Sequence, residues 1–133
     1  MALSVEHEDK YAPRKTGLYN AIVTKYNGRD SKDIDQMWYW DERDHTLRNY
    51  GHSESDAVLF EGFNKNLVIY RNLGRDSQKF TFNSNTHMLR NDHTKRAMSI
   101  EWAALKAGAN VVTKEVDDNY DGAGVNWSLE YCN

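Results

Sequence analysis

The chain carries one short phrase twice. His-Thr-Leu-Arg-Asn fills positions 45–49 and His-Met-Leu-Arg-Asn fills 87–91, so the two begin 42 residues apart. Seven residues before each histidine stands a large aromatic residue, Trp38 and Phe80, and a glutamine lies two positions before each ring. A third aromatic phrase, Val-Asn-Trp-Ser-Leu, places Trp127 47 residues after Phe80. Agreement that stays in register over such distances indicates three diverged copies of a unit of roughly 40 to 50 residues.

Further matches lie upstream of the aromatic phrases. Val-Thr-Lys occurs at 23–25 and again at 112–114, and both copies begin 15 residues before the anchor tryptophan. Gly-Arg-Asp-Ser occurs at 28–31 and 74–77, each time ahead of the glutamine. The repetition therefore extends over most of the unit, and a repeated Gly-Arg-Asp-Ser is typical of a turn in a scaffold.

The repeated phrases have the composition of short strands. They are rich in Val, Ile, Tyr, Phe and Trp and are bounded by Gly, Asn, Asp and Ser. The polar stretches at 41–44 and 83–86 predict hairpin turns, and 100–110 is interpreted as a loop with one helical turn. Bulky residues two positions apart share one face of a strand. The pairs expected in a common core are Trp38 with Trp40, Phe80 with Phe82, and Trp127 with Leu129.

Four strands per unit predict an all-β domain of twelve short strands spanning 1–133, closed into a three-fold barrel. The expected repeats are approximately 1–44, 45–86 and 87–133. In the preferred register Leu3 is the counterpart of Leu47 and Leu89, which gives twelve strands without remainder. An alternative register matches 2–7 with 97–102 and leaves one strand of the closed set missing.

Charge and composition narrow the possible functions. The formal charge is −3, and 17 basic residues are scattered among 20 acidic ones, which does not suggest nucleic-acid binding. No apolar run approaches the roughly 20 residues of a transmembrane helix, and the first ten residues are too acidic for a secretory signal. We therefore expect a soluble chain, cytoplasmic or non-classically secreted. Cys132 is the single cysteine, so no disulfide forms within the chain.

Enzymatic motifs are missing from the sequence. It contains no Ser-His-Asp context, no nucleophile elbow, no glycine-rich phosphate loop and no metal-binding His or Cys spacing. His45 and His87 occupy matching turn positions that three-fold geometry would place far apart, which favours solvated turn residues over a metal pair. We expect a protein that is not an enzyme, with no catalytic residue, metal or cofactor.

The aromatic phrases resemble those of a known family. Gln36–Trp38 has the Gln-x-Trp pattern, and aromatic phrases followed after a polar turn by Leu-Arg-Asn resemble the ricin B-chain-type β-trefoil lectins over essentially the whole chain. Phe80 in the second copy, Val125 in the third and the lack of cysteine pairs depart from the family pattern. The resemblance implies a β-trefoil and a carbohydrate-binding lectin with up to three shallow sugar sites. The expected ligands are galactose or N-acetylgalactosamine on glycans, bound multivalently.

In such pockets a carboxylate or amide bonds to sugar hydroxyls and an aromatic face covers the apolar side of the ring. Glu61 and Glu101 occupy the same relative place in their copies, and an ordinary exposed acid is the alternative interpretation of both. The last copy offers Glu101, Trp102, Asn119, Tyr120 and Asn126; the middle copy offers Glu61, Phe63, Asn64 and Asp76; the first offers Asp35 with Tyr11 or Tyr19.

A second hypothesis comes from a different functional class. The trefoil also carries proteins that bind other proteins, so the chain is alternatively a protease inhibitor or a docking module for a toxin or the cytoskeleton. The candidate contact surfaces are 6–27 and 104–110. Assembly into a homo-oligomer stays open under both hypotheses.

Overall fold

The computed structural model describes residues 1–6, 19–28, 33–52, 56–103, 106–122 and 124–130, and these form an all-β structure. Ten strands are present in the described part: β1 (Ala2–Val5), β2 (Tyr19–Thr24), β3 (Trp38–Asp41), β4 (Thr46–Asn49), β5 (Ala57–Glu61), β6 (Leu67–Arg71), β7 (Phe80–Asn83), β8 (Met88–Asn91), β9 (Ala97–Ile100) and β10 (Val111–Lys114). Single 3-10 turns connect some of them: η1 (Ile34–Gln36), η2 (Tyr50–His52), η3 (Phe63–Lys65), η4 (Asp76–Gln78) and η5 (Glu101–Ala103). None of the described helical segments has the length and apolar character to cross a bilayer.

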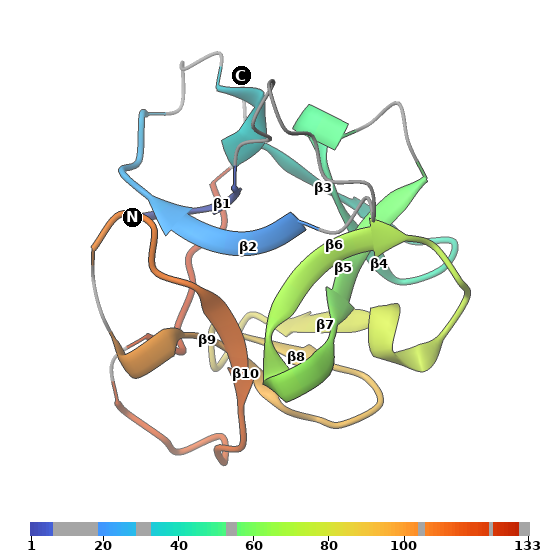
Figure 1. Ribbon diagram of the computed structural model, residues 1–133. Helices are drawn as coiled ribbons and strands as arrows, with labels where there is room; N and C mark the ends of the chain where they lie inside the picture. Colours follow the sequence, from blue (N-terminus) through green and yellow to red (C-terminus); the bar gives the residue numbers. More distant parts are fainter. Residues whose placement is uncertain (7–18, 29–32, 53–55, 104–105, 123, 131–133) are drawn as a thin grey trace.

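The strands pair as antiparallel hairpins that curl around a common centre (Figure 1). The sheet orders are β1-β2-β6-β5, β10-β9-β8-β7 and β3-β4. Three hairpins, β1–β2, β5–β6 and β9–β10, touch one another pairwise. The contacts are Tyr19 with Ile69, Ile22 with Asn110, and Asn66 with Val112. This curled arrangement is compatible with a β-trefoil. The hairpins β3–β4 and β7–β8 confirm the turns predicted at 41–44 and 83–86.

Strand pairing bears on the register of the first copy. β1 pairs with β2 as β5 pairs with β6 and β9 with β10. The indole Nε1 of Trp38 donates to the Leu3 carbonyl on β1 at 2.9 Å, and that of Trp127 donates to Met98 on β9 at 3.0 Å. These contacts agree with the alternative register and not with the preferred one, because Leu47 lies on β4, which pairs with β3. The repeat limits 1–44, 45–86 and 87–133 stay a prediction.

The predicted meeting of the bulky residues in a common core is confirmed for Trp38, for Trp127 and for both rings of the second pair, Phe80 and Phe82. Phe80 is fully buried in the main core cluster, and Trp38 and Trp127 pack against that cluster. The prediction was wrong for Leu129, which is 70% exposed, and largely wrong for Trp40, which is 37% exposed. The inward direction of Leu129 was expected from the alternation of side chains along a strand shared with Trp127. Residues 125–130 form no strand, so this alternation does not apply.

The glutamines of the aromatic phrases hold neighbouring backbone segments. Gln78 is fully buried; its Oε1 accepts from the Leu73 amide at 2.8 Å and its Nε2 donates to the Arg71 carbonyl at 2.8 Å. Gln36 Nε2 donates to the Lys25 carbonyl at 2.6 Å. Each glutamine thus ties the end of one hairpin to the 3-10 turn before the next strand.

The asparagines of the Leu-Arg-Asn phrases connect the same turns from the other side. Asn49 Nδ2 donates to the Asp35 carbonyl at 2.7 Å, and Asn91 Nδ2 donates to the Ser77 carbonyl at 2.9 Å. Both asparagines are buried. A buried backbone carbonyl needs a partner, so these two matching bonds explain the repeated asparagine.

The matching histidines are exposed turn residues, as expected. His45 and His87 have φ values of 59° and 58°, the left-handed region that suits a tight hairpin turn. Their carbonyls accept from the Phe80 amide at 3.0 Å and the Trp127 amide at 2.7 Å. Each turn therefore connects one hairpin to the aromatic anchor of the next copy.

Acidic residues surround the repeated arginine of the first copy. Arg48 donates to Asp56 at 2.6 Å and to Asp44 at 3.3 Å. Nearby, Arg43 donates two hydrogen bonds to the Asp41 carboxylate, at 3.0 and 2.8 Å. The bonds from Arg43 hold the pKa of Asp41 at about 2, below its usual 3.8. A carboxyl whose pKa is lower in the folded than in the unfolded chain stabilises the fold above the unfolded value.

Asp41→Asn should therefore lose stability relative to the parent chain at neutral pH. The difference should be constant above about pH 5 and should shrink as the pH falls from about 4 towards 2, where the parent carboxyl also becomes protonated. Urea unfolding of both proteins between pH 2 and 7 measures this. Glu42→Gln, at the exposed neighbouring position, is the control. A difference that does not change with pH would show that Arg43 does not hold the carboxylate.

Candidate functional site

The turn that follows β9 presents a tryptophan to solvent. All four residues of β9 are buried, and η5 begins directly after them. Trp102 has a φ of 58° and is 89% exposed. The start of the turn is anchored, because the Glu101 amide donates to the Asn110 carbonyl at 2.9 Å and the Ile100 amide donates to the Gly124 carbonyl at 3.1 Å. We call Glu101 and Trp102 the Trp102 site.

Both the exposure and the backbone of Trp102 are unusual. Tryptophan is highly buried on average, and a bulky residue with positive φ is an outlier that the surrounding structure must hold in place. Such outliers cluster at binding sites. An indole face covers apolar C–H groups, and the adjacent carboxylate accepts hydrogen bonds from hydroxyls. The Trp102 site therefore has both chemical elements that the sequence predicted for the last copy.

The other predicted residues of the last copy lie elsewhere. Tyr120 accepts from Lys114 Nζ at 2.9 Å, and that ammonium stands 4.8 Å from the tyrosine ring centre. Lys114 is the register partner of Ala97, whereas Val111 faces Ile100 next to the Trp102 site. Three residues along a strand span about 10 Å. Tyr120 and its neighbour Asn119 are therefore directed towards the opposite end of β9.

Asn126 is occupied by a different contact. It is exposed, and its Nδ2 donates to the carbonyl of Thr86 at 2.8 Å. Within the described contacts, no bond joins Asn126 to Glu101 or Trp102. The structure thus keeps two of the five last-copy candidates together.

In the middle copy Glu61 is part of the framework. Its Oε1 accepts from Thr113 at 2.8 Å, its Oε2 accepts from Thr94 at 2.7 Å, and Arg96 Nε lies 3.7 Å from Oε1. The side chain is 7% exposed. Both carboxylate oxygens are therefore engaged, unlike the arrangement expected of a sugar-binding acid. Asn64 is exposed in η3 with a φ of 57°, and the side chain of Phe63 lies outside the described residues.

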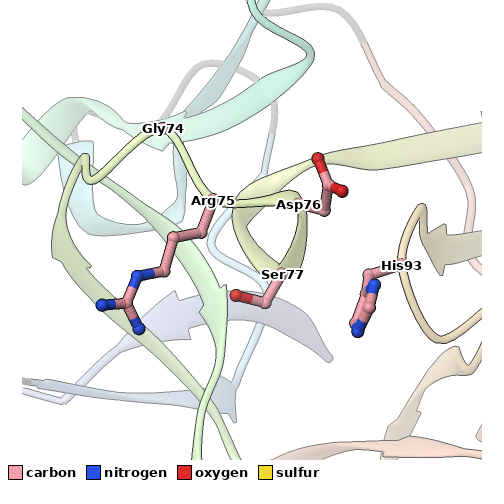
Figure 2. Close-up of a pocket in the computed structure, with 5 residues that line it drawn as sticks. All are labelled: Gly74, Arg75, Asp76, Ser77 and His93. Carbon is pink, nitrogen blue, oxygen red and sulfur yellow. The ribbon is translucent and has the colours of Figure 1, made fainter.

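Asp76 lines an open hollow of about 420 Å³ beside η4 (Figure 2). We call this feature the η4 hollow; its lining residues are Gly74, Arg75, Asp76, Ser77 and His93. Sequence reasoning proposed only Asp76. Arg75 and Ser77 belong to the repeated Gly-Arg-Asp-Ser, which was interpreted as a turn alone. His93 lies in the β8–β9 connection, where its amide donates to Asn91 Oδ1 at 3.0 Å, and no repeated spacing indicates it.

The first copy offers less. The Asp35 amide donates to Asp33 Oδ1 at 3.1 Å, and its carbonyl accepts from Asn49. Tyr19 is 8% exposed and packs against His52 with ring centres 5.1 Å apart, so it does not present a face to solvent. Tyr11, the other candidate, lies outside the described residues.

Comparisons with known proteins give a likeness of fold. Neither the models of known families nor the curated proteins include a match to this sequence. Among solved structures, one described as GalNAc-T7 with UDP, GalNAc and Mn²⁺ is similar, with a TM-score of 0.56 and 14% identity. The likeness covers 96% of this chain and 20% of that chain, so this chain spans about a fifth of its structural neighbour. At this identity the likeness shows a shared fold alone.

Proposed function

We propose that this protein is a carbohydrate-binding lectin and that the Trp102 site is its main sugar contact. The proposal is supported by the resemblance of the aromatic phrases to ricin B-chain-type lectins and by an all-β fold compatible with a trefoil. A structural neighbour that was solved with GalNAc adds support. The observation that carries the proposal is the 89% exposure of Trp102 directly after a glutamate, on a turn whose first residue is held by a backbone hydrogen bond.

Binding needs no chemical step. The apolar face of a pyranose lies on the indole, and Glu101 accepts hydrogen bonds from neighbouring hydroxyls. Because the Glu101 and Ile100 amides hold the start of the turn in place, the turn loses little conformational entropy on binding. Galactose and N-acetylgalactosamine are the proposed ligands because the resemblance to ricin B-chain-type lectins implies them and because the structural neighbour was solved with GalNAc.

A shallow site of this kind is expected to be weak by itself. A millimolar dissociation constant corresponds to about −4 kcal/mol. Simultaneous engagement of several sites on a branched glycan raises the apparent affinity by a factor on the order of 10² to 10⁴. We therefore propose multivalent recognition of glycans through this site and further sites.

Trp102→Ala should weaken glycan binding by about tenfold or more, because it removes the apolar platform, whereas Trp102→Phe should retain part of the binding. A glycan array identifies the ligand, and calorimetry on the parent chain and both variants measures the loss. Ile34→Ala, which truncates an apolar side chain that is 52% exposed on η1, is the matched control. Equal binding by the parent and Trp102→Ala would exclude the Trp102 site, and a blank array would exclude the lectin function.

The same exposed indole supports the protein-binding alternative. Tryptophan is enriched among residues that dominate protein interfaces. Trp102 lies two residues before the 104–110 segment that the sequence proposed as a contact surface, of which 104 and 105 lie outside the described residues. Of the other proposed surface, 6–27, most also lies outside them. Nanomolar inhibition within a protease panel, lost in Trp102→Ala and without any response to glycans, would favour this alternative.

A further inference from the structure

The η4 hollow combines several polar side chains without partners. In the described structure the Arg75 guanidinium, the Ser77 hydroxyl and the His93 imidazole make no hydrogen bond or ion pair with another residue. Asp76 has one distant ion pair, with Lys79 Nζ at 3.7 Å. Figure 2 shows Asp76 and His93 on one side of η4 and the Arg75 guanidinium on the other, with the Ser77 hydroxyl directed towards Arg75. Hydrogen-bonding groups of both kinds are therefore available to a ligand.

The backbone beneath these side chains is held firmly. Buried Gln78 fixes the Gly74–Ser77 segment through the Leu73 amide, and Asn91 Nδ2 holds the Ser77 carbonyl. The Asp92 amide donates to the Lys79 carbonyl at 2.8 Å, which joins the two walls of the hollow. A hollow whose walls are bonded together keeps its shape before a ligand arrives, and this preorganisation favours binding.

The charges in the hollow favour a particular class of ligand. Arg75 offers a fork of donors suited to a carboxylate or sulfate. Asp76 is an acceptor that suits hydroxyl groups and repels a bare anion. The hollow of about 420 Å³ opens widely to solvent, so a single sugar unit bound there keeps one side exposed. A ligand that satisfies both walls carries a negative group at one end and hydroxyls at the other.

We propose that the η4 hollow binds a monosaccharide unit that carries a sulfate or carboxylate. Arg75 binds the anionic group, with the Ser77 hydroxyl as a further donor, and Asp76 accepts from the sugar hydroxyls on the side of the hollow where His93 lies. This inference rests on the proposed lectin function. It adds a second subsite, specific for an acidic sugar, that is separate from the Trp102 site. Together the two sites would select glycans that bear both a neutral and an acidic sugar.

The test uses galactose 6-sulfate, galactose and sodium sulfate as probes, each titrated at constant ionic strength into the full chain and followed by NMR. We expect galactose 6-sulfate to shift the His93 ring signals in a saturable way. Arg75→Gln should weaken that binding by about tenfold or more, since a charge-assisted pair is lost. Lys106→Gln, which removes one positive charge at an exposed position away from the hollow, should leave it unchanged.

The remaining arms separate the alternatives. Asp76→Asn should weaken binding of galactose 6-sulfate and strengthen binding of inorganic sulfate. Unchanged affinity for galactose 6-sulfate in Arg75→Gln, or inorganic sulfate that binds the parent chain as tightly as the sulfated sugar, would overturn the acidic-sugar subsite. Galactose binding that disappears in Trp102→Ala tests the lectin function separately, so failure of one proposal does not imply failure of the other.

Discussion

Replacing Phe80 by alanine should lower the free energy of unfolding by about 3 to 5 kcal/mol, the usual cost of removing a buried phenylalanine ring. Phe80 is 0% exposed in the core cluster that also contains Leu59 and Val111 from other hairpins. The ring therefore lies where the hairpins β5–β6, β7–β8 and β9–β10 meet. Domains of this size are stable by only about 5 to 15 kcal/mol, so this variant should unfold at much lower denaturant concentration or fail to fold at 37 °C.

Chemical denaturation monitored by tryptophan fluorescence measures the loss of stability. Two further variants serve as controls. Phe80→Leu keeps most of the volume and should cost less than about 1.5 kcal/mol. Trp102→Ala removes a still larger ring from a site that is 89% exposed and should change stability by no more than about 0.5 kcal/mol. A cost below 1 kcal/mol for Phe80→Ala would mean that the ring does not lie in a shared core.

The local parts of the fold were predictable because local residues determine them. Bulky residues two apart and a polar turn specify a hairpin without reference to the rest of the chain, which is why β3–β4 and β7–β8 follow the sequence prediction. The backbone contacts of the repeated glutamines and asparagines are also local. Gln78 and Asn91 make these contacts within 14 residues along the chain.

The register of the first copy was not predictable from short matches. The four-residue segment around Leu3 matches more than one other segment of the sequence equally well. Whether Leu47 or Met98 is the counterpart of Leu3 depends on which strands pair in the folded chain. The Trp38–Leu3 and Trp127–Met98 bonds decide it, and both join residues about 30 positions apart. Leu129 failed for a related reason: alternation turns a side chain inward only where a strand exists.

The candidate site shows the same limit. Glu61 and Glu101 stand at the same relative place in the sequence, yet their surroundings differ. Thr94 and Thr113 approach Glu61 from the β8–β9 connection and from β10, whereas Glu101 follows a strand end beside the exposed Trp102. Likewise, His93 and Asp76 line the same hollow only because the β8–β9 connection folds against η4. Contacts between distant segments determine which acid is free to bind a ligand.

Removing the Glu61 carboxylate should be the second most costly change. Glu61→Ala should lower the free energy of unfolding by about 2 to 3 kcal/mol, because it removes two hydrogen bonds from threonine hydroxyls and one carboxylate from a partly buried ion pair. The partner is Arg96, whose side chain is 17% exposed and which also donates from Nε to Thr113 Oγ1 at 3.1 Å. Glu61→Gln keeps one acceptor oxygen and should cost less. Urea unfolding at neutral pH measures both.

Glu101→Ala is the matched control, because it truncates the same residue type at the same relative position and should change stability by no more than about 0.5 kcal/mol. A double-mutant cycle of Glu61→Ala with Thr113→Val should give a coupling energy of about 0.5 to 3 kcal/mol, as expected of residues in one hydrogen-bond network. If instead Glu61→Gln kept full stability and lost glycan binding while Glu101→Ala bound normally, the roles would be reversed. Glu61 would then be the sugar-binding acid, and the exposed carboxylate beside Trp102 an ordinary surface group.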